Sequence, residues 1–384
     1  MRGQCAAPAL ALALGLTLSA CAPAAPADGT QAGAVSWDSL AYDHSLELEY
    51  ADQFSVDYYQ GDYALIEIGD GERYLVVPEG EEVPAGLEEG VTILRQPLDR
   101  IYLVATSAMD LFCALDGLDA IRLSGTNTSG WYLPQAKAAM EAGDILYAGK
   151  YSAPDYELIY DQGCNLAVES TMIYHTPEVK EQLETLGIPV LVERSSYESS
   201  PLGRMEWVKL YGVLLDREAE AEALYQEQLE QLTEGLSQTG SGKTAAFFYI
   251  TANGTANVRK SGDYVAEMIR MAGGEYIFQD LGEGDSALST VNLQMETFYA
   301  GAKDADVLIY NSTIDGELYT MEELLSKSAL LADFKAVQEG NVWCTGQNLF
   351  QSTMGLGDMI LDLHAVLTQE DPDPAELIYL HRLT

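Results

Sequence analysis

The feature that most constrains the fold is a long stretch of helical periodicity in the middle of the chain. Ser200 and Pro201 are good helix-starting residues, and apolar residues then recur at helical spacing, among them Trp207, Leu214 and Leu229. A helix over 200–236 would be roughly 50 Å long at about 1.5 Å per residue, which is more than one small lobe can bury. We therefore predict a single connecting helix over 200–236 that joins two lobes.

On both sides of this helix, short apolar runs alternate with segments of helical period. In the first half an apolar run at 101–105 is followed by a helical pattern at 108–118, and in the second half a new run begins at 245–250. Strand–helix alternation is typical of parallel α/β sheets. We predict an α/β fold of two doubly wound lobes, an N-terminal one over 38–199 and a C-terminal one over 245–384.

A different pattern occupies the front of the first lobe. The runs at 54–58, 63–68 and 74–77 are separated by Gly-Asp and Asp-Gly pairs, which are hairpin signals. The sequence therefore predicts a small N-terminal β-hairpin addition between Ser45 and Leu94, and it gives no function for it.

The first residues have the order of a secretory signal. Arg2 precedes an apolar run over 9–18, about half of the roughly 20 residues that a membrane-spanning helix needs. Leu18-Ser19-Ala20-Cys21 resembles the lipobox of bacterial lipoproteins, which implies that the signal is 1–21 and that Cys21 is acylated. An ordinary signal with an incidental cysteine is the alternative. Residues 22–37, rich in Ala, Pro and Gly, fit a flexible tether.

The charge balance restricts the partners. The chain has 60 acidic and 20 basic residues and a net charge of -40, so its surface repels nucleic acid and anionic lipid headgroups. With 47% hydrophobic residues and 23 tyrosines, packed cores are expected in place of disorder. We expect a monomer outside the cytoplasm, held at the outer face of the cell membrane by its lipid alone.

Once Cys5 and Cys21 are set aside, the cysteines and histidines give little support for a metal or redox site. Cys113, Cys164 and Cys344 are far apart, without Cys-x-x-Cys spacing, so buried thiols are favoured and one disulfide is the alternative. The chain contains four histidines, whereas capture of a bare metal ion needs several ligands converging on one ion. We predict no metal site and no cofactor.

An ordered set of segments carries a family resemblance. It comprises the strand and turn at 100–107, the segment 149–159, the helix-to-strand turn at 186–190, the helix start Pro201-Leu202-Gly203-Arg204-Met205-Glu206-Trp207 and the strand Asn341-Val342-Trp343. Across roughly 98–368 the chain resembles the periplasmic binding proteins of ABC importers for iron–siderophore, haem and cobalamin, whose two α/β lobes are joined by one long helix. The resemblance implies a carrier and not an enzyme, which delivers a small-molecule ligand, here a ferric siderophore or similar chelate, to a permease and, through it, to an ATPase.

In that family one exposed carboxylate on each lobe docks against arginines of the permease. The matching positions are Glu157, in Asp155-Tyr156-Glu157-Leu158-Ile159, and Glu296, in Gln294-Met295-Glu296-Thr297-Phe298. Two fixed rim charges can steer docking and set its orientation. In so acidic a chain, the alternative is that both are ordinary solvated helix residues.

Ligand contacts are expected in the loops that follow the strands, where parallel α/β sheets bind their ligands. Flat aromatic surfaces suited to a large chelate come from Trp131, Tyr132, Tyr151, Tyr174 and Tyr197, with loop packing as their alternative role. Positive donors for an anionic chelate come from Arg204, Arg259 and Lys260, and Arg204 can equally pair with nearby acids.

Other functions remain as alternatives. A haem or cobalamin carrier of the same fold is one, with His175 as a haem-iron ligand together with Tyr174 or Met172. A surface-anchored sensor is another. A serine hydrolase is disfavoured because the chain has no Gly-x-Ser-x-Gly elbow. Paired carboxylates for glycan chemistry stay open because sequence spacing does not fix their separation in space.

Overall fold

The computed structural model describes residues 35–69, 71–236, 240–282 and 289–384. The expected signal over 1–21, its Cys21 and most of the tether lie outside these ranges. Within them, no helix combines the length and the apolar character needed to cross a membrane.

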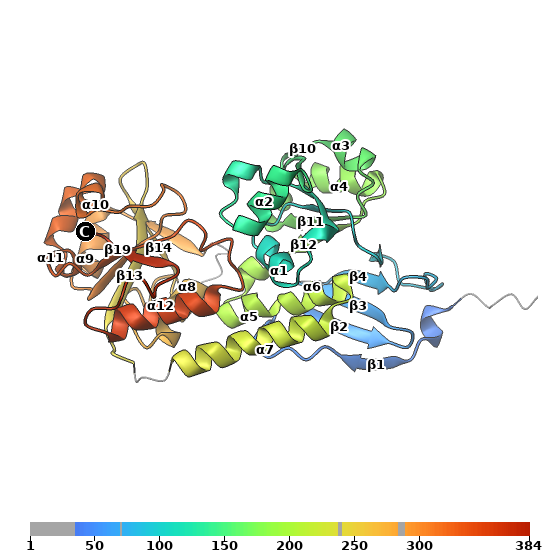
Figure 1. The fold of residues 1–384 in the computed structure, drawn as a ribbon, viewed down its shortest axis with the longest axis horizontal. Coiled ribbons are helices and arrows are strands. Elements are labelled where there is room, and N and C mark those ends of the chain that lie inside the picture. Colours follow the sequence, from blue (N-terminus) through green and yellow to red (C-terminus); the bar gives the residue numbers. More distant parts are fainter. Residues whose placement is uncertain (1–34, 70, 237–239, 283–288) are drawn as a thin grey trace, which may run out of the picture. The chain divides into compact units, whose positions relative to one another are not determined.

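The N-terminal addition is a twisted sheet whose strands lie side by side in chain order (Figure 1). Its strands are β1 (Tyr42–Ser45), β2 (Phe54–Tyr59), β3 (Tyr63–Ile68), β4 (Glu72–Val77) and β5 (Val91–Arg95). The first four pair antiparallel, which confirms the predicted hairpins, whereas β5 pairs parallel to β4. One face buries Val56 and Ile66 in the main core, and the opposite face buries Tyr63 and Leu75 in a small separate cluster.

The first lobe contains the predicted parallel sheet. In spatial order its strands are β12 (Val190–Glu193), β11 (Leu166–Ser170), β6 (Ile101–Leu103), β7 (Ile121–Ser124) and β8 (Leu146–Tyr147). Its helices are α1 (Ala108–Ala114), α2 (Pro134–Ala142), α3 (Tyr156–Asp161) and α4 (Pro177–Thr185), and the short β9 (Gly149–Lys150) and β10 (Ala153–Pro154) pair as a hairpin. Because β6 lies between β7 and β11, the strand order reverses there, and the loops after β6 and β11 flank a topological switch point.

The second lobe has a mixed sheet with a parallel centre. In spatial order its strands are β16 (Thr290–Leu293), β14 (Ala256–Arg259), β13 (Thr244–Ile250), β17 (Val307–Tyr310), β18 (Val342–Thr345) and β19 (Leu380–Arg382), and β15 (Glu275–Tyr276) also pairs with β13. The central β13, β17 and β18 are parallel, whereas β14, β16 and β19 are antiparallel. Its helices are α8 (Tyr264–Met271), α9 (Met295–Ala302), α10 (Met321–Lys327), α11 (Lys335–Gln338) and α12 (Leu356–Thr368).

The prediction of one continuous helix over 200–236 is wrong. Over this fully described range the chain forms α5 (Pro201–Glu206), α6 (Val208–Leu215) and α7 (Glu218–Gly235). Asp216 ends α6 with φ 58°, a left-handed conformation that Asp adopts more readily than most residues. The chain then reverses, and α7 packs beside α6 (Figure 1). A Cβ on Gly212 would lie 2.7 Å from the Cβ of Ala221, so glycine permits the close approach.

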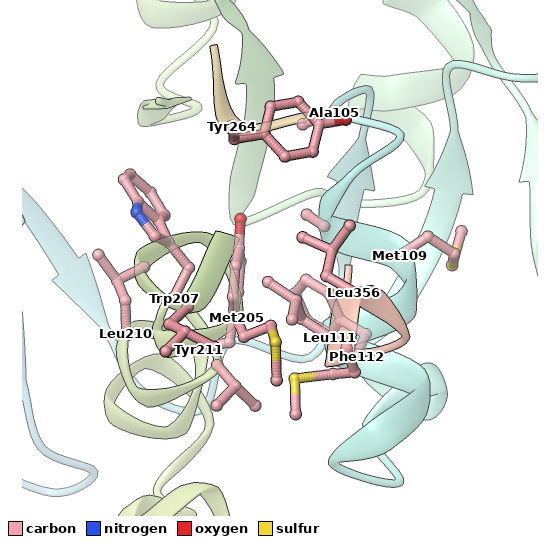
Figure 2. Close-up of a cluster of buried hydrophobic side chains, with 14 of the residues drawn as sticks. Ala105, Met109, Leu111, Phe112, Met205, Trp207, Leu210, Tyr211, Tyr264 and Leu356 are labelled. Atoms are coloured by element: carbon pink, nitrogen blue, oxygen red, sulfur yellow. The ribbon is translucent and has the colours of Figure 1, made fainter. Parts of the chain in front are cut away.

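The α5–α6 segment lies at the centre of the main core. Figure 2 shows Met205 and Tyr211 on the side of Leu111 and Phe112 of α1, whereas Trp207 and Leu210 lie on the other side of the segment. Leu356 of α12 and Tyr264 of α8 also belong to the cluster. Their burial joins side chains from both lobes, and apolar burial stabilises by about 25 cal/mol per Å².

Two buried carboxylates attach the β1–β5 sheet of the N-terminal addition, called the front sheet below, to the α5–α6 segment. Glu206 of α5 accepts hydrogen bonds from the backbone N–H groups of Glu49 (3.0 Å), Tyr50 (2.8 Å) and Ala51 (2.9 Å). Glu198 accepts from the N–H groups of residues 52 and 53 and from the indole of Trp207. The backbone leading into β2 is therefore bound by side chains that lie more than 140 residues away in the sequence.

One buried carboxyl has no such partners. Glu169, near the end of β11, is fully buried, and neither of its oxygens has a hydrogen-bond partner among the described residues. Burial alone raises the pKa of Glu169 to about 8, so this side chain is largely protonated at neutral pH.

Replacing Glu206 tests the attachment of the front sheet. We expect Glu206→Gln to lower the free energy of unfolding by about 3 kcal/mol, because the amide accepts fewer of the backbone N–H groups and removes one of the two carboxylates that pair with buried Lys209, the one 3.2 Å away. Denaturant unfolding measures this loss. Glu230→Gln, on an exposed position of α7, should stay within about 0.5 kcal/mol of the wild type. Equal stability of the two variants would contradict the account.

Glu169 predicts a pH dependence. Its pKa in the folded state is about 8, against an ordinary value of 4.5, so its contribution to stability is present below pH 4.5 and is lost as the pH rises through about 8. Glu169→Gln removes this titration. Between pH 4.5 and about 8, the free energy of unfolding of the variant relative to that of the wild type should rise by roughly 1.4 kcal/mol per pH unit. Parallel pH profiles for the two proteins would show that Glu169 does not titrate abnormally.

Candidate functional site

The strand-end loops of the two lobes form the candidate site. In the first lobe they cover 104–107 after β6, 125–132 after β7, 171–175 after β11 and 194–197 after β12. In the second lobe the loop after β18 covers 346–355. Ligands of open α/β sheets bind outside the carboxyl ends of the strands, beside the switch point.

Hydrogen bonds join the 346–355 loop to the first lobe. The side chain of Gln351 donates to the carbonyl of Gly130 (2.8 Å) and accepts from the N–H of Tyr132 (2.8 Å). Thr353 donates to the carbonyl of Ser107 (2.7 Å). These contacts bring strand-end loops from both lobes together.

Asp110 adds a charged group to this junction. Its carboxylate, in the first turn of α1, accepts from the N–H of Met354 (2.9 Å). Burial raises the pKa of Asp110 to about 6, and the N–H groups of Met354 and Gly355 partly oppose this shift. The carboxylate form is thus held mainly by backbone donors of the other lobe.

Arg259 is not in a loop as expected but is the last residue of β14, and it contacts the 346–355 loop of this junction. Its guanidinium is 5.0 Å from the ring centre of Phe350, in the loop after β18, and 5.8 Å from that of Phe247. Asp263 is 3.6 Å away, and the Arg259 side chain is 13% exposed. An arginine against aromatic rings, with one carboxylate beside it, is well placed to donate to an anionic group.

The other predicted cations have different surroundings. Arg204 lies over the ring of Tyr264, 3.5 Å from its centre, and donates to the carbonyl of Ser196 (2.7 Å). Its guanidinium therefore links α5 to α8, which does not support the predicted ligand contact. The aliphatic stem of Lys260 lies against Gly282, where an added Cβ would approach its Cδ to 2.6 Å.

The predicted aromatic residues separate into two groups. Tyr132, Tyr174 and Tyr197 are exposed, on the loops after β7, β11 and β12. The guanidinium of Arg194 lies 4.8 Å from the ring centre of Tyr197. Tyr151 is half-buried and packs against a buried apolar cluster of the first lobe that is separate from the main core.

Trp131 does not support the predicted role. It is 2% exposed, so it offers no face to a ligand. Its indole N–H is already satisfied by the hydroxyl of Ser124 and the carbonyl of Thr126, each at 3.2 Å. Its alternative role, packing of the loop after β7, accounts for what the structure shows.

Both predicted docking carboxylates are exposed. Glu157 lies in the first turn of α3 and Glu296 in the first turn of α9, one on each lobe. Carboxylates are favourable near helix N-termini, so these positions are compatible with a local structural role as well, and their docking role stays a prediction.

Sequence reasoning missed Gln351, Asp110 and Thr353. Each makes its contact with a residue more than 200 positions away, and no local pattern signals such a pairing. It also missed Glu193 at the end of β12, which is buried and accepts from the N–H of Ser195 (2.8 Å) and the hydroxyl of Ser107 (3.1 Å). Burial raises the pKa of Glu193.

Cys164 and Cys344 are buried, as the sequence favoured, whereas Cys113 is half-buried. Cys113, Cys164 and Cys344 are free thiols, and burial raises the pKa of each, to about 12, 12 and 11 respectively. Thiols with raised pKa values are poor nucleophiles. In the described ranges, no three His, Cys, Asp or Glu side chains gather closely enough to hold a metal ion.

Comparison with known proteins places this geometry in a family. A family model described as periplasmic binding protein matches residues 105–349. An uncharacterized lipoprotein of Methanocaldococcus jannaschii is 26% identical over 354 residues, which cover 86% of this chain and 82% of that protein.

Solved structures share the fold at low identity. A periplasmic heme binding protein from Pseudomonas aeruginosa aligns with a TM-score of 0.56 and 18% identity, over 74% of this chain and 98% of the other. A protein of an ABC-type Fe3+-hydroxamate transport system from Saccharomonospora viridis aligns with a TM-score of 0.55 and 19% identity, over 70% and 93%. Family and fold are those of substrate-binding proteins and not of enzymes. With its two α/β lobes and their facing strand-end loops, the chain belongs to the periplasmic binding protein family.

Proposed function

We propose that this protein is the lipid-anchored solute-binding component of an ABC importer and that it carries a ferric siderophore or a similar iron chelate. The observation that carries the proposal is Arg259, largely buried against Phe350 at the junction of the strand-end loops. A permease, with its ATPase, is the partner that receives the ligand.

The negative net charge of the chain makes a local positive group such as Arg259 important for binding an anionic ligand. With a net charge of -40, the protein as a whole repels anions. Binding of a carboxylate, catecholate or hydroxamate chelate therefore depends on local donors, and a guanidinium offers several in a fixed planar arrangement. The exposed rings of Tyr132, Tyr174 and Tyr197 add flat surfaces for the body of the chelate.

The lipid anchor rests on the sequence. Leu18-Ser19-Ala20-Cys21 lies outside the described residues, and its match to a lipobox is supported by the lipoprotein name of the Methanocaldococcus jannaschii relative. Acylation at Cys21 would hold the protein at the outer face of the cell membrane.

A haem or cobalamin carrier is the second candidate. It is favoured by His175, which is exposed in the loop after β11 next to exposed Tyr174, because imidazole and phenolate are both ligands of haem iron. Such a ligand would change the chemistry of the site and leave the fold and the partners unchanged.

A thermal-shift screen tests the ligand class. The purified protein is heated with ferric siderophores, haemin, cobalamin and free divalent metals, and we expect a selective rise with one ferric chelate, equivalent to about 2.7 kcal/mol at a hundredfold excess over Kd. Arg259→Gln should abolish most of the rise. Arg270→Gln is the control, because Arg270 also pairs with a carboxylate, Glu267 at 2.7 Å, but on the exposed surface of α8.

The screen also separates the alternatives. A rise with haemin that depends on His175 and not on Arg259 would favour the second candidate. No rise with any chelate, together with a clear rise on zinc or a sugar, would overturn the chelate assignment.

Charge reversal tests the docking carboxylates. In cells that depend on this importer, we expect Glu157→Arg with Glu296→Arg to lower chelate uptake at least tenfold, because like charges facing permease arginines cost several kcal/mol, while Kd for the chelate stays unchanged. Glu181→Arg, on an exposed position of α4, is the matched control. Wild-type uptake by the double variant would remove both residues from the docking surface.

A further inference from the structure

A cavity lies outside the strand-end loops. Its volume is about 870 Å³, and its walls are the front sheet, the 96–99 and 117–120 segments and the turn from α6 to α7. None of the strand-end loop residues discussed above lines it. The N-terminal addition, for which the sequence predicts no function, therefore forms one wall of this cavity.

The floor of this cavity is apolar. Ala64 and Val76 of the sheet, Leu98, and Val213 and Leu214 of α6 line it, and all five are buried. Exposed lining residues, among them Asp62, Asp216 and Ala219, mark the side that is open to solvent. An apolar body can enter from that side and lose its contact with water.

The polar lining is predominantly acidic. Burial raises the pKa of Glu218, and the nearby charges of Asp216, Glu220 and Asp62 raise it further. Arg217 also lines the cavity, but its guanidinium donates to the backbone carbonyls of Leu115 and Asp116. A bound cation would relieve the repulsion among these carboxylates.

The walls are held by contacts of their own. The amide of Gln96 donates to the carbonyl of Val213 near the end of α6 (3.1 Å). Lys209 bonds Glu222 of α7 (2.9 Å), and the ring of His44 stacks on that of Tyr58 with centres 4.6 Å apart. A preformed cavity of this kind loses little conformational entropy when it binds.

We propose that this cavity binds a small amphipathic organic cation, with its ammonium or guanidinium group against Asp62, Asp216 and Glu218 and its apolar body on the floor. The volume falls within the roughly 300–1,000 Å³ of small-molecule pockets. The acidic lining excludes anions, so this site and the proposed chelate site differ in ligand charge. A bare metal ion is disfavoured, because the described acids do not form a cluster that could coordinate one.

Calorimetric titration of the purified protein tests the proposal. The probes are phenethylammonium, its longer ω-phenylalkylammonium homologues and the matching phenylalkyl carboxylates. We expect saturable binding of the ammonium ions that strengthens with chain length and weakens with salt, and no binding of the carboxylates. Neutralisation by Asp62→Asn or Glu218→Gln should weaken binding roughly two- to fivefold each. Asn retains the left-handed conformation that Asp62 adopts at φ 61°.

Ala219→Trp tests the location. Ala219 is an exposed lining residue of α7, so the indole should block the opening without disturbing the core, and binding should be lost at an unchanged melting temperature. Glu230→Gln, an exposed acid of α7 outside the lining, should bind as the wild type does. Absence of saturable binding across the ammonium series, equal binding of carboxylates, or binding unaffected by Ala219→Trp and both neutralisations would overturn the proposal.

Discussion

The arrangement of this protein depends on two buried carboxylates that bind a segment of backbone. Glu198 and Glu206 together accept the N–H groups of residues 49–53. A buried carboxylate without donors is costly, so the chain and the two side chains must be ordered together. Because α5 also packs against α8 and α12, and the following α6 packs against α1, in the main core (Figure 2), the α5–α6 segment positions the front sheet and connects the cores of both lobes.

Sequence reasoning found the elements whose signals are local. The hairpins at 54–77 and the parallel strands of the first lobe follow from period-two alternation and apolar runs. It missed the break at Asp216. The helical spacing of apolar residues continues on both sides of Asp216, and one residue with a left-handed backbone conformation does not change that spacing. Sequence reasoning also could not predict the pairing direction of each second-lobe strand, since an apolar run looks the same whether its neighbour runs parallel or antiparallel.

At the candidate site, the sequence could propose residues but could not orient them. Trp131 and Tyr132 are adjacent in the loop after β7, yet Trp131 is buried on Ser124 and Thr126, while Tyr132 is exposed. Which of the two side chains is buried depends on which one can hydrogen-bond its polar group in the core. Arg204 and Arg259 were both candidate donors, and they differ because Tyr264 lies beneath one and Phe350 of the strand-end loop beneath the other.

The central claim is that a ferric chelate binds between the strand-end loops of the two lobes. Iron-edge anomalous diffraction from crystals grown with such a chelate tests this most directly, because it locates the iron without prior assumption about the ligand. The account predicts a strong iron peak bounded by the loops at 125–132 and 171–175 and by Arg259 and Phe350. An iron peak with no contact to these loops, whether in the cavity beside the front sheet or on the outer surface, would contradict it.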